Sequence, residues 1–229
     1  MARRRAKIVI VEGPSDNTAL SVYLSRYFDE KKIEFIELHS NILYEKYKKP
    51  NNIITDLNNI IEEYLENNRY IRLTYIDEII QIVDTDGMFI EDSKVIEDNN
   101  ATSNHYTLDN VYTDNVEKIR DLNKIKTGNM ESLLSKNDIT IRKHKIPYSV
   151  YYMSRNLEHV LHNRMDNVSD NDKKKLAFQF ANKYKNILDF VDFIKNSNFS
   201  VNDEYKISWS FIKKDTNSLK RFSNLGLIL

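Results

Sequence analysis

Acidic residues follow three short apolar runs of the sequence, and their type and spacing are suited to chemistry. Glu12 comes directly after the first run, Asp84 and Asp86 follow a later one, and Glu158 lies just past the last. Acids gathered at one place repel one another unless they are protonated or bind a cation. Because several carboxylate oxygens together suit Mg²⁺ or Mn²⁺, the sequence predicts a divalent-cation site.

The motif Asp84-Thr-Asp-Gly87 places two acids two residues apart. If the backbone stays extended, alternate residues point the same way, so both carboxylates can face one cation or bridge two. The acids also have plainer interpretations. Asp and Gly favour turns, so the motif can be only a turn. Glu12 can be only a polar residue at a strand exit, and Glu158 only a solvated charge on a helix.

The elements that must position these acids alternate between strands and helices. Runs rich in β-branched residues predict strands over 7–11, 33–38 and 79–83, and apolar spacing predicts a helix over 51–67. This alternation is typical of an α/β fold in which helices cover a parallel sheet. Ligands of such folds bind beyond the carboxyl ends of the strands, which is where the acids are expected.

The remainder of the chain predicts a polar insertion, two more strands and a helical end. Residues 91–114 are poor in apolar side chains and indicate an insertion or loop. Strands are expected over 139–141 and 149–153, followed by a helix that Ser154 caps. The clearest helical pattern covers 173–195.

Composition excludes several classes of protein. The 34 Lys and Arg residues balance 34 Asp and Glu residues, which excludes a uniformly basic polyanion binder. There is no cysteine, so disulfides, thiolate zinc sites and cysteine nucleophiles are excluded. The four glycines form neither of the standard nucleotide-binding loops. No apolar run suits a membrane span or a secretory signal, so a cytoplasmic protein is expected.

Charge is unevenly distributed along the chain. Residues 173–229 carry eleven Lys or Arg against five acids, whereas residues 77–138 carry fourteen acids against six bases. A basic end is suited to holding a polyanion beside an acidic site, although each charged stretch can also be a solvated face. Arg155, Lys213 and Lys214 are the candidates for neutralising a phosphate, and each is also explained as a surface cation.

Two groups of side chains suggest other chemistry. His159 and His162 lie three residues apart and can be metal ligands or ordinary histidines. Tyr148, Tyr151 and Tyr152 raise the idea of a tyrosine nucleophile, but alternating aromatic residues in a strand usually belong to the core.

Two motifs resemble those of the TOPRIM domain, the catalytic module of topoisomerases, primases and several nucleases. They are Ile8-Val-Ile-Val-Glu-Gly-Pro-Ser-Asp16 and Ile79-Ile-Gln-Ile-Val-Asp-Thr-Asp-Gly87. The resemblance covers about residues 7–165 and implies a TOPRIM-like, Rossmann-like parallel sheet flanked by helices. Residues 166–229 are then a basic, mainly helical C-terminal extension.

Among TOPRIM proteins the chain is most similar to the overcoming-lysogenization-defect (OLD) type nucleases. Their Glu-Gly motif carries a second acid four residues on, which Asp16 matches, and a Glu on the helix after the last strand, which Glu158 matches. The resemblance implies a two-metal mechanism in which Glu12, Asp84 and Asp86 are catalytic and all five acids bind Mg²⁺ or Mn²⁺. OLD proteins carry an ATPase on the same chain, which this sequence lacks, and the lysine expected near the end of the domain has no unique match.

The resemblance implies an endonuclease that cuts DNA or RNA. Stand-alone TOPRIM chains of this kind resemble toxic effectors of bacterial anti-phage systems, which a partner ATPase regulates in trans. Two alternatives stay open, an RNA-processing maturase and a non-catalytic module that binds nucleic acid. Self-association of the chain is also left open.

Overall fold

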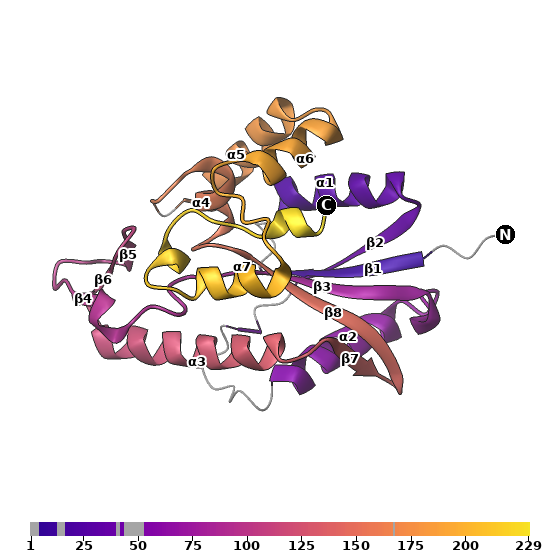
Figure 1. The fold of residues 1–229 in the computed structure, drawn as a ribbon, viewed down its shortest axis with the longest axis horizontal. Helices are drawn as coiled ribbons and strands as arrows, with labels where there is room; N and C mark the ends of the chain where they lie inside the picture. Colours follow the sequence, from indigo (N-terminus) through magenta and orange to yellow (C-terminus); the bar gives the residue numbers. More distant parts are fainter. Residues whose placement is uncertain (1–4, 13–16, 40–41, 44–52, 167) are drawn as a thin grey trace. The chain divides into compact units, whose positions relative to one another are not determined.

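The structure is a computed structural model whose contacts divide the chain into two compact units (Figure 1). The residues described are 5–12, 17–39, 42–43, 53–166 and 168–229. The two units are Met1–Ile82 with Gly128–Tyr151, and Val83–Thr127 with Tyr152–Leu229. Each unit therefore combines segments that are far apart in the sequence. The division by contacts does not coincide with a boundary between 7–165 and 166–229.

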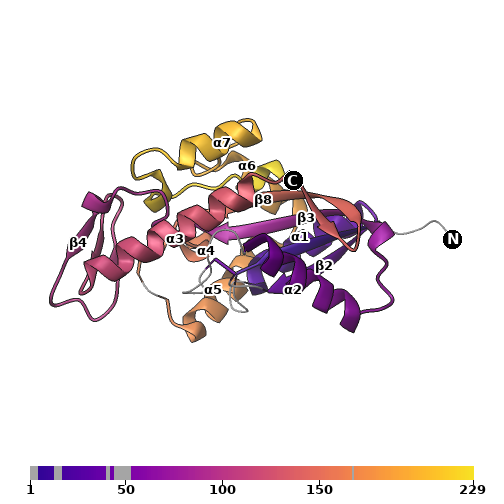
Figure 2. The same cartoon turned by 90° about the horizontal axis from the view of Figure 1, so that it is seen from below.

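A five-stranded sheet forms the centre of the first unit, in the order β2-β1-β3-β8-β7 (Figures 1 and 2). Strand β1 (Arg5–Val11) lies between the edge strand β2 (Ile33–His39) and β3 (Ile76–Asp84), and it runs parallel to both neighbours. The last two residues of β3 belong to the second unit. The predicted α/β class and the parallel pairing of these β-branched strands are confirmed.

The sheet is mixed, however, and the prediction of a purely parallel sheet is wrong at one edge. Strand β7 (Asp138–Ile141) pairs antiparallel with β8 (His144–Met153). The two residues between them, Arg142 and Lys143, both have positive φ, at 45° and 72°. Positive φ at both central positions is the geometry of a two-residue hairpin turn, which usually carries Asn-Gly or Asp-Gly. Arg-Lys lacks that signature, so the hairpin was not predicted.

Helices α1 (Asn17–Glu30) and α2 (Ile53–Asn67) cover opposite faces of this sheet (Figures 1 and 2). The buried residues of α2 recur every fourth position, which places them on one face of the helix. They are Ile53, Leu57, Ile61 and Leu65. The amphipathic helix predicted over 51–67 is therefore confirmed, and a 3₁₀ turn at Leu73–Tyr75 leads into β3.

The second unit contains a small sheet where the sequence predicted a polar insertion or loop. Strands β4 (Val95–Glu97), β6 (Val111–Thr113) and β5 (His105–Tyr106) lie in that order, after a 3₁₀ turn at Asp92–Lys94. The segment is ordered by a few buried apolar side chains, namely Val95, Val111, Ile119 and Leu219. Helix α3 (Val116–Leu134) follows and ends in the first unit.

The remaining helices of the second unit are short. They are α4 (Leu157–His162), α5 (Asp170–Lys183), α6 (Ile187–Asn196) and α7 (Tyr205–Ile212), with 3₁₀ turns at Asn217–Leu219 and Leu225–Leu227. Two sequence predictions need correction here. The helix predicted over 173–195 is two helices, because the Asn186 side chain accepts the Leu188 N–H (3.0 Å) and starts α6 afresh. Asn156 caps α4 in place of Ser154, by accepting the His159 N–H (2.9 Å).

A buried amide joins three segments of the second unit. The Asn224 side chain is fully buried, accepts the Tyr152 N–H (2.8 Å) and donates to the Ser208 hydroxyl (3.0 Å). Replacing it with Ala leaves both buried groups without this partner, and a buried unsatisfied polar group costs about 1–3 kcal/mol. The Ser208 hydroxyl keeps its hydrogen bond to the Tyr205 carbonyl (2.8 Å), so we expect Asn224→Ala to lower the free energy of unfolding by about 1–3 kcal/mol in urea denaturation. The exposed Asn198→Ala is the control, and equal stability of the two variants would contradict this prediction.

Candidate active site

The acids predicted from the sequence lie at strand ends, as expected, but in different units. Glu12 directly follows β1 in the first unit and is buried. Asp84 ends β3, and Asp84 and Asp86 both belong to the second unit. Asp16 lies outside the described residues. The grouping of Glu12 with the two aspartates therefore stays a prediction.

Backbone hydrogen bonds fix the segment that carries Asp86. The Thr85 N–H donates to the Met153 carbonyl (3.1 Å), and the Asp86 N–H donates to the Arg155 carbonyl (3.0 Å). The Thr85 hydroxyl in turn accepts the Arg155 N–H (2.7 Å) and donates to the Ser218 carbonyl (2.7 Å). The ends of β3 and β8 are thus bonded together, and this holds Asp86 beside Arg155.

The Asp84-Thr-Asp-Gly87 motif is a turn, so of the two interpretations of this motif the turn describes its backbone, and the condition of an extended backbone is not met. Asp86 and Gly87 have φ of 38° and 80°, and the Met88 N–H donates to the Thr85 carbonyl (2.7 Å). Arg155 also has a positive φ, 59°. Left-handed backbone is uncommon for residues other than glycine and clusters at functional sites. Asp86 and Arg155 both have this conformation and are joined by a backbone hydrogen bond, so together they mark a candidate functional site at the end of β3.

Two buried cations face the Asp86 carboxylate. Lys126 on α3 is only 6% exposed, and its Nζ lies 3.8 Å from Asp86 Oδ2. Arg155 is 2% exposed. Burial raises the pKa of Asp86 above its ordinary value and the nearby Glu158 adds to the rise, whereas Lys126, Arg155 and Lys173 oppose it. Burial thus makes the ionised form costly, and the cations offset part of that cost.

Glu158 completes a group of charged side chains within the second unit. It lies on α4, is buried, and its Oε1 is 3.1 Å from Nζ of Lys173 on α5. We call these five residues the Asp86 cluster: Asp86, Lys126, Arg155, Glu158 and Lys173. Lys126, Arg155 and Glu158 are buried, whereas Asp86 and Lys173 are partly exposed, so two acids and three cations share one partly buried region.

Sequence reasoning missed Lys126 and Lys173. Lys126 occupies a position on α3 that the helical period assigns to the buried face, together with Ile119, Asn123, Met130 and Leu133. A lysine at a core position of an amphipathic helix is the signal that would have found it, because unpaired buried lysines are costly. Lys173 gives no comparable signal, since it lies in a run of three lysines.

The other predicted cations lie in the second unit, outside the Asp86 cluster. Lys213 caps the end of α7, and its Nζ lies 5.6 Å from the centroid of the Phe89 ring. Lys214 is exposed. Both remain candidates for contacting a polyanion at the surface.

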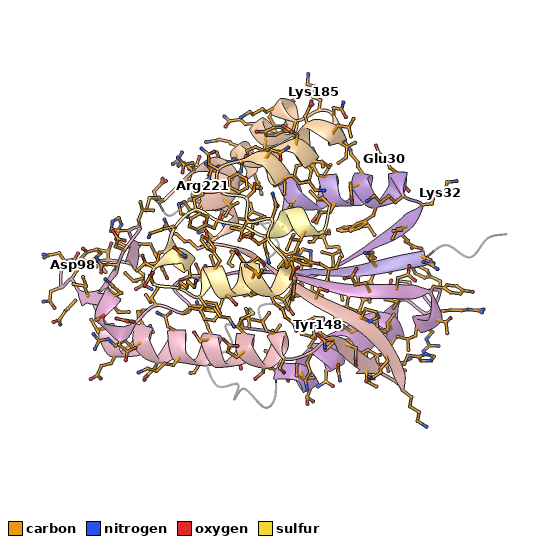
Figure 3. The ribbon with its side chains drawn as sticks, viewed as in Figure 1. Glu30, Lys32, Asp98, Tyr148, Lys185 and Arg221 are labelled. Atoms are coloured by element: carbon orange, nitrogen blue, oxygen red, sulfur yellow. The ribbon has the colours of Figure 1, made fainter. Side chains whose placement is uncertain are left out.

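The tyrosines considered as nucleophiles belong to the hydrogen-bonded core. The Tyr148 hydroxyl, labelled in Figure 3, donates to Gln81 Oε1 (2.6 Å), and both side chains are buried. The Tyr152 hydroxyl donates to the Ser208 carbonyl (3.1 Å). Burial raises the pKa of Tyr152, so its phenolate is disfavoured.

The two histidines of α4 also fit a structural role. His159 is buried, and burial together with Arg155 and Arg221 lowers its pKa to about 4. Burial likewise lowers the pKa of His162. Both imidazoles are therefore neutral at pH 7.

This shift predicts how stability changes with pH. In the unfolded chain His159 protonates near its ordinary pKa of 6.5, whereas in the folded protein it protonates near 4. Between these two pH values the unfolded state therefore binds more protons than the folded state. The free energy of unfolding linked to His159 consequently falls by an amount on the order of 3 kcal/mol as the pH falls from about 6.5 to 4. We expect His159→Gln to lose less stability over this range than the parent in thermal unfolding scans. The exposed His144→Gln should behave like the parent, and an unchanged slope in His159→Gln would refute the assignment.

The donor chemistry fits a hard divalent cation, since carboxylate oxygens are the ligands that Mg²⁺ and Mn²⁺ prefer. Among the residues that the structure describes, however, no three His, Asp or Glu side chains converge closely enough to hold a metal ion. Within the second unit the Asp86 cluster supplies two carboxylates, Asp86 and Glu158. A complete metal site is therefore a prediction that needs further ligands.

No protein-family model matches the chain, and neither a curated protein nor a solved structure matches it. The resemblance to TOPRIM proteins therefore rests on the motifs and on the α/β topology. None of the helices in the described part of the chain is long and apolar enough to cross a membrane.

Proposed function

We propose that the chain is a metal-dependent nuclease of the TOPRIM type. The observation that carries this proposal is the turn after β3, in which the half-buried Asp86, whose pKa burial raises, lies beside the buried Lys126 and Arg155. Residues with perturbed pKa values cluster at functional sites. The parallel pairing of β1 with β3 supports the same assignment.

The acids are the residues that would hold Mg²⁺ or Mn²⁺, with Asp84, Asp86 and Glu12 as the predicted ligands and Asp16 and Glu158 beside them. When bound, such ions activate a water molecule and stabilise the leaving oxygen of a phosphodiester. A water near pH 7 is otherwise a poor nucleophile. The chain has no cysteine that could replace this chemistry.

The cations of the Asp86 cluster have a separate task in this proposal. A phosphodiester approaching two carboxylates is repelled by them, and a nearby Lys or Arg offsets that repulsion. Arg155 is suited to bind phosphate oxygens in pairs, because its guanidinium presents several donors in a fixed plane. Lys126, whose Nζ lies 3.8 Å from the carboxylate of Asp86, opposes the rise in the pKa of Asp86 and so favours its ionised form.

The biological role that we propose follows the resemblance, as the toxic effector of an anti-phage system with an ATPase acting in trans. An RNA-processing enzyme is the second candidate. It would use the same acidic residues as the anti-phage nuclease but would cut a different substrate. A non-catalytic binding module is disfavoured, because carboxylates at a phosphate site weaken binding unless a cation offsets them.

The test is incubation of the purified chain with plasmid DNA and with total tRNA in Mg²⁺, Mn²⁺ or EDTA. We expect one substrate to be cut in Mg²⁺ or Mn²⁺ and neither to be cut in EDTA. Binding of nucleic acid without cleavage in any metal would favour the binding module. Cutting that persists in EDTA would contradict the metal-dependent mechanism.

A further inference from the structure

A cavity of about 550 Å³ opens within the second unit, next to the Asp86 cluster. Residues 103–107 around β5 form much of its wall, and Arg155, Met165 and Asp166 form the rest. Arg155 belongs both to this wall and to the Asp86 cluster, so the cavity adjoins the candidate active site. Its volume is in the range of cavities that bind small ligands.

Arg155 indicates what the cavity binds. Its side chain is one of the largest fully buried side chains among the described residues, and its Nη1 makes no hydrogen bond with any of them. A buried donor that stays unsatisfied is costly, and more so on a charged group. An acceptor arriving from the cavity would offset this cost. The acceptor that best fits a guanidinium is a phosphate or carboxylate oxygen.

The acids around Arg155 are paired with other cations, so the net charge near Arg155 permits an anion to bind. Asp86 and Glu158 face it from the cluster, and these acids are already shared with Lys126 and Lys173. Asp166, the acid of the cavity wall, pairs with Arg164 through two hydrogen bonds of 2.8 and 2.5 Å. The cavity wall is therefore not left with an excess of negative charge.

The rest of the wall suits a nucleobase. The Arg155 Cζ lies over the Tyr106 ring, 5.0 Å from its centroid, so the cation and the ring form a cation–π pair in the cavity wall. His105 adds a second ring, and Ser103 and Asn104 add hydroxyl and amide groups. Bases of single strands stack on aromatic and guanidinium planes and are read by polar groups at their edges.

We propose that this cavity binds one nucleotide of a single-stranded substrate beside the bond that is cut, with its base on Tyr106 and its phosphate on Arg155. The inference rests on the proposed nuclease function and names its substrate class. A base that is paired and stacked in a duplex cannot enter a cavity without leaving the stack. The protein should therefore prefer single strands, loops or ends.

The test measures binding in EDTA, so that cleavage does not interfere. Fluorescence anisotropy is recorded for a labelled single strand of about 12 nucleotides, as DNA and as RNA, and for the matching duplex. We expect the single strand to bind at least about tenfold more tightly than the duplex. Tyr106→Ala should weaken binding of the single strand by about 5- to 150-fold, since stacking contributes about 1–3 kcal/mol per base.

Two variants serve as controls. Tyr106→Phe keeps the ring and should bind within about twofold of the parent. Tyr70→Ala removes a tyrosine of the first unit that is 74% exposed, and it should bind like the parent. Equal affinity for single strand and duplex, or parent-like binding by Tyr106→Ala, would overturn the proposal.

A second measurement covers the case in which Tyr106→Ala does not fold. A single strand carrying 5-iodouracil is cross-linked by light to the unaltered protein, and the peptide is identified by mass spectrometry. We expect the cross-link within residues 103–107, and a cross-link confined to other peptides would overturn the proposal.

If the cavity binds as expected but no substrate is cut in Mg²⁺ or Mn²⁺, the nuclease proposal fails and the binding site stands. If the parent cuts but does not use the cavity, only this inference fails.

Discussion

Asp86→Asn is expected to abolish cleavage of nucleic acid, with a loss of about 10³-fold or more in single-turnover rate. A metal ion supplies several kcal/mol of transition-state stabilisation, and each 1.36 kcal/mol is a factor of ten. The amide keeps the size of the carboxylate but removes its charge, so it no longer attracts a divalent cation. Because Asp86 is half-buried in a turn after β3 and does not belong to the apolar core, the variant should keep the fold.

Asp121→Asn is the matched control for this change. Asp121 is an exposed acid on α3 in the same unit, and its loss should leave the rate within about twofold of the parent. Circular dichroism and thermal unfolding report whether each variant is folded. A folded Asp86→Asn protein that cuts as fast as the parent would remove Asp86 from the mechanism.

Lys126→Met is the variant with the second largest expected effect, a loss of about 10²-fold in cleavage rate. Lys126 is buried 3.8 Å from the Asp86 carboxylate, and methionine fills the same space without the charge. Asp86 then loses the cation that most opposes the rise of its pKa. The carboxylate becomes harder to ionise, and an approaching phosphate meets less positive charge.

Rescue by Arg separates this role from a purely structural one. Lys126→Arg restores the cation and should recover at least about a tenth of the activity that Lys126→Met loses. Lys124→Met changes an exposed lysine of the same helix and should leave the rate unchanged. If Lys126→Met and Lys126→Arg lose activity equally while both stay folded, charge at this position is not what cleavage requires.

The sequence predicted the fold best where the residues of a segment themselves favour one secondary structure. Runs of Ile and Val make buried strands because β-branched side chains pack well on a sheet, and β1 and β3 have such runs. The pattern did not reveal the hairpin at Arg142–Lys143, because backbone with positive φ there is imposed by the pairing of β7 with β8. The small sheet of β4 to β6 was missed for a related reason, since strands of two or three residues are too short for a periodic signal.

The candidate site was predictable in its acids and in Arg155, but not in Lys126 or Lys173. Asp84 and Asp86 stand out because they directly follow an apolar strand, and ligands bind beyond such strand ends. The left-handed backbone of Arg155 depends on hydrogen bonds to Thr85 and Ser218, which are distant in the sequence. The contact between Lys126 and Asp86 likewise joins residues forty positions apart. Such contacts follow from the tertiary fold and leave little trace in local pattern.

Anomalous diffraction from crystals grown with Mn²⁺ tests the central claim most directly, because it locates the metal and its ligands together. The proposed mechanism predicts a manganese peak within about 2–2.5 Å of an Asp86 or Asp84 carboxylate oxygen, and a second ion about 4 Å away when a phosphodiester is bound. Glu12 is predicted to supply a further oxygen. A fully loaded crystal with no manganese peak near either aspartate, from protein that cuts nucleic acid in the same Mn²⁺ solution, would contradict the assignment of these acids as the metal site.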